Sequence, residues 1–345
     1  MSNTTPKLRV LLTNDDGPPG HDSPYIYGLY KHLTQDLGWD VKVVIPSSQK
    51  SWIGKAYQIT EIIRGRYYYP RGADGAGEIS ESPRPLKEGE TAEWILLDGT
   101  PATCANIALH NLYPGEIDLL ISGPNLGRNT SAAFSLSSGT LGAALSSSLS
   151  KQRAIALSYG TVERPTPTVY FEPAHVLASR IVRHLWANWG LDVGGVRDGE
   201  VDLYSVNIPM IEDLLSAAGP PICWTRMWRN SYGRLFKVHA HAKPATSPAG
   251  PDSLNSNVQG GLDDAGVAAS SAANQLVFKF SPAMEGLINP AMSDIPVGSD
   301  GWAIAKGWVS VTPLRASFAE PAHENMGDTP YTPEELERAV WKYKL

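Results

Sequence analysis

The stretch Leu8–Gly17, which reads LRVLLTNDDG, constrains the fold more than any other part of the chain. Its first six residues are nearly all apolar or β-branched, which is typical of a strand buried on both faces of a parallel sheet. Asp15 and Asp16 follow directly, and two adjacent carboxylates at the end of a buried strand are unfavourable unless a positive charge lies between them. Ligands of open α/β sheets bind at this end of the strands. A divalent cation would satisfy both conditions, although Asp-Asp-Gly is also an ordinary turn sequence.

The residues that follow predict a strand–helix–strand unit. Apolar positions with helical spacing run from Ile26 to Leu37, and Gly38 ends them. Val41–Pro46 is a second buried strand, so the connection is predicted to be parallel and right-handed. Further strands are predicted at 93–97, 117–122, 154–158, 201–208, 275–280 and 308–313, and further helices begin at Thr100, near Ser138 and at about Pro173. The predicted fold class is α/β, a Rossmann-type doubly wound and mostly parallel sheet with a C-terminal β-hairpin and helix extension.

The domain organisation follows from shifts in composition. We expect an α/β catalytic core over 1–221, with a surface insertion at about 70–92, where Pro, Gly and charged residues accumulate. Residues 222–345 are expected to complete the fold. They comprise a hairpin at about 222–242, a flexible Ala/Ser/Gly/Pro-rich insertion at about 243–274, the last strands at about 275–313 and a terminal helix at about 333–343.

Charge and cysteine content exclude several classes of protein. The chain of 345 residues has a net charge of −6 and no basic run, which argues against binding long nucleic acid. No apolar run is long enough to span a membrane, and the N-terminus lacks the apolar core of a signal peptide. The two cysteines, Cys104 and Cys223, are in no metal-binding spacing. We therefore expect a cytoplasmic protein with a small-molecule substrate and no membrane partner.

Polar loops follow three of the predicted strands: Asp15 and Asp16 after the first, Ser48–Ser51 after the second, and Ser122–Asn125 with its continuation to Thr140. In a doubly wound sheet these loops converge on one edge. Their side chains offer only oxygen, which favours Mg²⁺, Mn²⁺ or Ca²⁺ over zinc or copper. A helix that begins at 138–140 would direct free backbone N–H groups at an anion. A cation and an anion cradle together indicate phosphate-ester chemistry.

These features resemble the SurE family of metal-dependent nucleotidases and acid phosphatases. The resemblance depends on short motifs that occur in family order over about 8–314. They are Asn14-Asp15-Asp16-Gly17, Lys50-Ser51, Gly99-Thr100-Pro101 with Cys104, Ser122-Gly-x-Asn125, Ser138-Gly139-Thr140, Asn207-Ile-Pro209 and Gly307-Trp-Val-Ser-Val-Thr-Pro313. The form of 49–54 and the insertion at 243–274 are similar to eukaryotic, fungal-type members.

The resemblance implies a site. Metal ligands carry over to Asp15, Asp16, Ser51 and Asn125, which would hold one cation per subunit, Mg²⁺ or Mn²⁺, with Ca²⁺ possible in a crystal. Phosphate and substrate contacts carry over to Asn14, Asn129, Ser138, Gly139 and Thr140. The family commonly forms homodimers or homotetramers. The chain departs from the bacterial pattern at His21 and in the loop around Arg128, so the roles of these two residues stay open.

The implied activity is hydrolysis of nucleoside 5′- or 3′-monophosphates by metal-assisted attack of water, with Asp15 and Asp16 as catalytic carboxylates. Each residue also has a structural interpretation: Ser51 as a loop hydroxyl, Asn125 as a turn residue, Ser138 as a helix cap and His21 as a solvated residue. The absence of G-x-G-x-x-G and of a P-loop argues against a nicotinamide-dependent oxidoreductase and a P-loop NTPase. A non-catalytic nucleotide-binding or scaffold protein on the same fold is the alternative.

Overall fold

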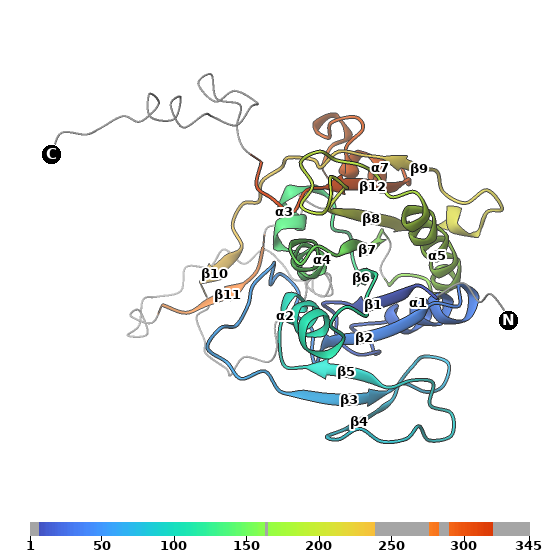
Figure 1. Ribbon diagram of the computed structural model, residues 1–345. Helices are drawn as coiled ribbons and strands as arrows, with labels where there is room; N and C mark the ends of the chain where they lie inside the picture. The colour runs from blue at the N-terminus through green and yellow to red at the C-terminus, as the bar shows by residue number, and fades with distance from the viewer. Residues whose placement is uncertain (1–6, 163–164, 239–275, 283–289, 320–345) are drawn as a thin grey trace, which may run out of the picture.

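A twisted, mostly parallel sheet forms the centre of the computed structural model, which describes residues 7–162, 165–238, 276–282 and 290–319 (Figure 1). Within these residues ten strands follow the order β4-β3-β5-β2-β1-β6-β7-β8-β12-β9. Their bounds are β1 Arg9–Thr13, β2 Asp40–Pro46, β3 Gly65–Tyr69, β4 Glu78–Ser80, β5 Trp94–Leu97, β6 Leu119–Leu126, β7 Arg153–Thr161, β8 Leu203–Met210, β9 Ile222–Trp224 and β12 Val309–Leu314. The six central strands, from β5 to β8 in the sheet order, are parallel, and β12 is antiparallel to β8. The predicted fold class is confirmed.

Helices cover both faces of the sheet. Their bounds are α1 Ile26–Lys31, α2 Pro101–Ile107, α3 Ser131–Ser137, α4 Gly139–Leu149, α5 Phe171–Ala187 and α7 Asp300–Ala305. In Figure 1, α2 lies against α4, and α1 lies next to α5. Alternate residues of each strand point to opposite faces, so Val10 and Leu12 join the core cluster under α1 and α5, whereas Leu11 joins the cluster under α2 and α4. Of the helices in the described ranges, none has the length and apolar character needed to cross a membrane.

The order of the strands creates a switch point at β1. The chain moves from β1 to β2 on one side, and β6 later pairs with the other side of β1. The crossover connections therefore diverge at the carboxyl ends of β1 and β6, which is where doubly wound sheets bind their ligands. Asp15 follows β1, and Asn125 lies near the end of β6. The topology thus places two of the four predicted metal ligands, Asp15 and Asn125, at this switch point.

The predicted hairpin at 222–242 is wrong for the residues that the structure describes. Instead, β9 pairs in parallel with β12 at the edge of the main sheet. The next strand, β10 Phe236–Val238, pairs with β11 Phe278–Phe280 in a separate two-stranded ribbon. Alternating half-exposed residues fit any edge strand, so the pattern could not identify the partner. The expected insertion at 243–274 and the terminal helix at 333–343 lie outside the described residues.

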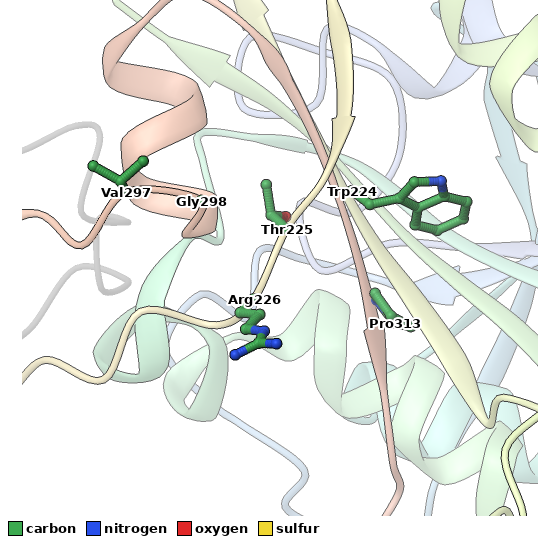
Figure 2. A pocket seen from close by; sticks show the side chains of 6 residues that line it. All are labelled: Trp224, Thr225, Arg226, Val297, Gly298 and Pro313. Atoms are coloured by element: carbon green, nitrogen blue, oxygen red, sulfur yellow. The ribbon is translucent and has the colours of Figure 1, made fainter.

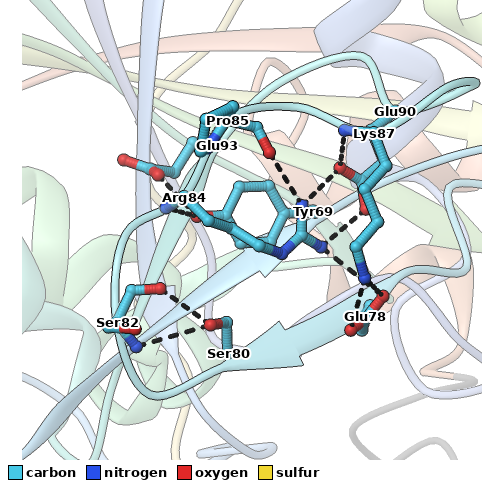
Figure 3. Close-up of polar contacts among 9 residues, drawn as sticks. All are labelled: Tyr69, Glu78, Ser80, Ser82, Arg84, Pro85, Lys87, Glu90 and Glu93. Carbon is cyan, nitrogen blue, oxygen red and sulfur yellow. Dashed lines mark hydrogen bonds and ion pairs between the residues drawn. The ribbon is translucent and has the colours of Figure 1, made fainter.

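The segment expected to be a surface insertion at 70–92 extends the opposite edge of the sheet, where β4 pairs with β3. A group of five side chains, here called the Arg84 cluster, holds it together: Arg84, Glu90, Lys87, Glu78 and Tyr69 (Figure 3). Arg84 donates two hydrogen bonds of 2.7 Å to the two carboxylate oxygens of Glu90, and its guanidinium lies 3.7 Å from the centre of the Tyr69 ring. Lys87 is paired with Glu78 at 2.7 Å. Every acid of the cluster therefore has a cationic partner.

Candidate active site

Asp15 is the centre of the candidate site, and its partners are neutral. Asp15 is 2% exposed, and its Oδ1 accepts a hydrogen bond of 2.7 Å from the Thr140 hydroxyl. Burial raises the pKa of Asp15 to about 6, from an ordinary value of 3.8, although hydrogen bonds from Thr140 and from the Gly139 backbone act in the opposite direction. In the described part of the chain no Lys, Arg or His is ion-paired with Asp15. Its negative charge is therefore available to a cation.

The beginning of α4 touches this aspartate because residue 139 is glycine. A Cβ atom at Gly139 would lie 2.9 Å from the Cβ of Asp15 and 3.1 Å from a side-chain carbon of Ile53. Ser138 is the N-cap of α4, where its Oγ accepts a hydrogen bond of 3.2 Å from the Leu141 N–H. The expected helix start is confirmed, and the side chains at 138 and 140 hydrogen-bond to Leu141 and Asp15. The predicted contacts of 138–140 with phosphate stay a prediction.

Asp16 connects the first strand to the loop that carries Asn125. Its Oδ2 accepts a hydrogen bond of 2.8 Å from the backbone N–H of Leu126, 110 positions further along the chain. The pairing of β6 with β7 is shifted between Ser122 and Asn125, and such bulges redirect side chains at the end of a strand. The Asn125 Nδ2 donates 2.8 Å to the Gly127 carbonyl, which fixes the orientation of its amide. Asp15, Asp16 and Asn125 therefore converge on one end of the sheet.

Ser51 lies in the loop that follows β2, and this loop contacts Asp15. The preceding residue, Lys50, donates its backbone N–H to the Asp15 carbonyl at 2.7 Å. Gly17 has a φ of +86°, and a Cβ atom at this position would lie 3.3 Å from the backbone of Ser48. The missing side chain therefore allows the loop after β2 to approach closely. The loop is thus held against the aspartate pair, although the role of Ser51 as a metal ligand stays a prediction.

Two asparagines of the predicted site have structural hydrogen bonds. Asn14 is fully buried and closes the turn after β1, since its amide contacts the backbone of Gly17 and the hydroxyl of Ser23. Asn129 donates its backbone N–H to Asn207 at 2.7 Å and its side-chain amide to Ser158 at 2.9 Å. Both residues brace the site, and their contacts with substrate stay predictions.

His21 and Arg128, whose roles were open, lie in different surroundings. The His21 side chain is 99% exposed, contacts Asp22 at 3.1 Å and lines a separate cavity of about 480 Å³ beside α1 and α5. This position agrees with the solvated-loop interpretation. Arg128 lies over β7, since a Cβ atom at Gly160 would be 3.3 Å from the Cβ of Arg128.

Residues on β7 and β8 also belong to this region and were not predicted as site residues. Ser158 on β7 and Asn207 on β8 lie in the C-terminal halves of these strands and hold the Asn129 loop. Asn207 stands in a motif that the sequence shares with the family, and this was the signal that could have identified it. Asp300 is a further case: its buried carboxylate accepts backbone N–H groups of Ser131 and Trp228, which positions the start of α3. No local pattern indicates that role, because its partners lie 169 and 72 positions away.

The donor set fits a hard divalent cation. Two carboxylates, an amide and a hydroxyl offer only oxygen, and the burial of Asp15 without a cationic partner is the observation that carries this conclusion. The hydroxyls of Thr13 and Ser122, register partners at the ends of β1 and β6, are also buried with no hydrogen-bond partner among the described residues. In the same ranges no group of three or more His, Cys, Asp or Glu is placed to hold a metal, so only a mixed oxygen set is available.

A second cavity, of about 440 Å³, lies where β9 and β12 form one edge of the sheet (Figure 2). Its lining consists of Trp224, Thr225, Arg226, Val297, Gly298 and Pro313. None of these residues is a carboxylate, and none belongs to the predicted site. This cavity therefore does not offer the oxygen ligands that the loops after β1 and β6 carry.

Comparisons with known proteins indicate one family. Residues 10–234 match the family model described as Survival protein SurE. The chain is 33% identical to the probable tubulin–tyrosine ligase PBY1 of Saccharomyces cerevisiae over 95% of its own length, but it spans only 43% of that protein. It is 27% identical to the 5′-nucleotidase SurE of Acinetobacter baylyi, with 89% of this chain and 93% of that protein covered. The crystal structure of the SurE protein from Aquifex aeolicus superposes with a TM-score of 0.54 at 22% identity, covering 90% of this chain and 94% of that one, which shows a shared fold.

Proposed function

The chain belongs to the SurE family, and we propose that it is a divalent-metal-dependent phosphomonoesterase that hydrolyses nucleoside 5′- or 3′-monophosphates. The observation that carries the proposal is the buried Asp15 at the switch point of the sheet, whose charge has only neutral partners among the residues that the structure describes. The full-length match to a relative named as a 5′-nucleotidase supports the same assignment. Assembly as a homodimer or homotetramer and a cytoplasmic location stay predictions.

Asp15, Asp16, Ser51 and Asn125 would hold the cation, Mg²⁺ or Mn²⁺. When bound, the cation would neutralise charge on the phosphoryl group and lower the pKa of the attacking water. The Thr140 hydroxyl orients the Asp15 carboxylate, and the Leu126 N–H orients that of Asp16. One of the two carboxylates accepts the proton of the water. The backbone N–H groups of Gly139 and Thr140 at the start of α4 hydrogen-bond to Asp15, so they hold the carboxylate in place, and contacts of 138–140 with the phosphoryl oxygens stay a prediction.

The names of the relatives leave a second candidate activity, which we do not adopt. The name tubulin–tyrosine ligase belongs to a protein of which this chain covers less than half, whereas the match to the nucleotidase covers nearly the whole of both chains. A non-catalytic nucleotide-binding protein on the same fold is the alternative that the experiment must separate from an enzyme.

The direct test is hydrolysis of AMP and of p-nitrophenyl phosphate with Mn²⁺ or Mg²⁺, before and after treatment with a chelator. We expect activity that chelation removes and that either cation restores. Activity that survives thorough chelation would indicate a metal-independent, covalent mechanism. Binding of AMP without hydrolysis under any of these conditions would identify a binding protein instead.

A further inference from the structure

Trp52 has a strained backbone next to the candidate site. Its φ is +61°, in the left-handed region that residues with a Cβ rarely adopt, so this backbone conformation is strained. It stands between Ser51 and Ile53, and Ile53 approaches Gly139. The same loop is tied to α3, because the Gly54 N–H donates 2.9 Å to the Ser137 carbonyl. The strained tryptophan is therefore part of the loop that borders Asp15.

The indole of Trp52 is the centre of four aromatic side chains from separate parts of the chain, which we call the aromatic platform: Trp52, Phe134, Tyr232 and Phe280. The centre of the Trp52 ring system lies 6.1 Å from that of Phe134 on α3, 6.2 Å from that of Tyr232 and 5.3 Å from that of Phe280 on β11. In Figure 1 the β10–β11 ribbon lies beside α3 and the loop after β2. The platform thus joins the ribbon to the border of the site.

The platform is not part of the two large hydrophobic cores. The buried cluster beneath it contains only Ala133 and Phe134, with Trp52 packed against them. Tyr232 is 44% exposed, and Phe236, whose ring contacts Phe280 at 5.5 Å, is 54% exposed. Of the platform rings Phe134 is buried, Trp52 and Phe280 are partly buried and Tyr232 is half-exposed. So small a cluster contributes little to stability compared with the two large cores, and it does not account for a strained backbone at Trp52. Strain that packing does not explain is typical of a functional position.

We propose that the aromatic platform stacks the base of the nucleotide whose phosphate is hydrolysed at Asp15. This inference rests on the proposed function and names the part of the substrate that the loop at 50–54 selects. The occupant is a nucleobase because every base has a flat π-face that can stack on a ring. Trp52 of the platform directly follows the predicted metal ligand Ser51 in the chain, so a base on the platform would be attached to a phosphate at the metal site. Stacking without hydrogen-bond readout accepts purines and pyrimidines alike. The platform therefore predicts a preference for nucleotides over other phosphomonoesters, with tolerance of the base.

The preference is measured as the ratio of kcat/KM for AMP to that for ribose 5-phosphate, which keeps the sugar and phosphate but lacks the base. Stacking on aromatic side chains is worth about 1–3 kcal/mol per base, so we expect a ratio of about 5 to 150. Trp52→Gly should reduce this ratio to within about threefold of unity, because the main ring is lost. Glycine relaxes the positive φ, so the variant should fold. Trp52→Phe keeps a ring and should retain most of the preference.

Two further variants keep the test decisive. Tyr232→Leu removes a half-exposed ring of the platform and should lower the ratio less than Trp52→Gly does. Trp224→Leu removes a ring that is 61% exposed at the distant edge of the sheet, and it should leave the ratio unchanged. Binding of AMP and of ribose 5-phosphate by calorimetry gives the same comparison without turnover. There we expect Trp52→Gly to weaken AMP about tenfold and ribose 5-phosphate hardly at all.

The outcomes separate this inference from the proposed function. Equal rates for the two substrates in the wild type, or an unchanged ratio in Trp52→Gly, would show that the platform only packs the ribbon against the core. The phosphomonoesterase assignment would survive that result. If neither substrate is hydrolysed, the proposed function fails, and the calorimetric comparison then decides the base-stacking inference by itself.

Discussion

The Arg84 cluster and the Asp15 site show two ways in which this chain buries a carboxylate. The Glu90 side chain is 1% exposed, and Arg84 grips both of its oxygens. Hydrogen bonds from Arg84 lower the pKa of Glu90 to about 2. Asp15, which is 2% exposed, accepts hydrogen bonds from the Thr140 hydroxyl and from backbone N–H groups, has no cationic partner among the described residues, and has its pKa raised by burial to about 6. The same chemical group thus has its pKa moved in opposite directions.

The difference lies in what each carboxylate has left to bind. The charge of Glu90 is compensated within the fold, so the Arg84 cluster stabilises the β3–β4 edge and has no further ligand to hold. The charge of Asp15 is uncompensated by the described side chains, so binding of the proposed cation would stabilise the folded state. Four predictions test this contrast, from the largest expected effect to the smallest.

Asp15→Asn should separate activity from stability. The neutral amide cannot bind the cation as a carboxylate does, so kcat/KM for AMP should fall by about 10²–10³-fold or more. Without metal, the variant should be more stable than the wild type by about 1–3 kcal/mol, because a buried uncompensated charge has been removed. Enzyme assays and urea unfolding in chelator measure the two effects. A loss of stability together with activity would instead assign Asp15 a structural role.

Thr140→Val should weaken the site without altering its shape. Removing the hydroxyl leaves the Asp15 carboxylate unoriented, and loss of such a partner typically reduces metal affinity or activity about 10–100-fold. Calorimetric titration with Mn²⁺ and steady-state kinetics measure the change. Thr140→Ser, which keeps the hydroxyl, is the matched control and should retain most of both. Equal behaviour of the Val and Ser variants would contradict the orienting role.

Arg84→Met should have the opposite effect to Asp15→Asn. It leaves Glu90 buried without its cation, so the melting temperature should fall, while kcat/KM should stay within about twofold of wild type. The double variant Arg84→Met with Glu90→Gln should recover part of the lost stability, since no uncompensated charge remains. Lys87→Met, which breaks an exposed pair, should lower the melting temperature less. A fall in activity as large as that in Thr140→Val would contradict the separation of the two regions.

The pH dependence of Glu90→Gln gives the smallest effect. Because the pKa of Glu90 is lowered to about 2 from an ordinary 4.5, the ionised group stabilises the fold above pH 4.5. That contribution is lost as the pH falls from 4.5 towards 2. The stability difference between wild type and Glu90→Gln should therefore shrink across this window. Urea unfolding at several pH values between 2 and 6 measures it, and a constant difference would show that the charge of Glu90 is not involved.

Much of the site could be predicted because its signals are local. The apolar run of 8–13, the adjacent aspartates and the Ser138 cap each act over a few residues, and the structure shows the strand, the pair and the helix start. The bonds that complete the site could not be predicted in this way. The contact of Thr140 with Asp15 spans 125 positions, and that of Asn129 with Asn207 spans 78. Such contacts depend on which strands become neighbours, and local patterns do not record that.

The sequence by itself determined the class of the fold and the chemistry at the end of its first strand, because hydrophobic periodicity, helix caps and the types of side chain are properties of short segments. Only the tertiary structure decided that β9 and β10 have different partners, that the start of α4 hydrogen-bonds to a buried aspartate, and that Trp52 gathers rings from three other segments. The physical reason is that burial, charge compensation and ring contacts depend on the surroundings of a group, and these surroundings come from residues far away in the chain.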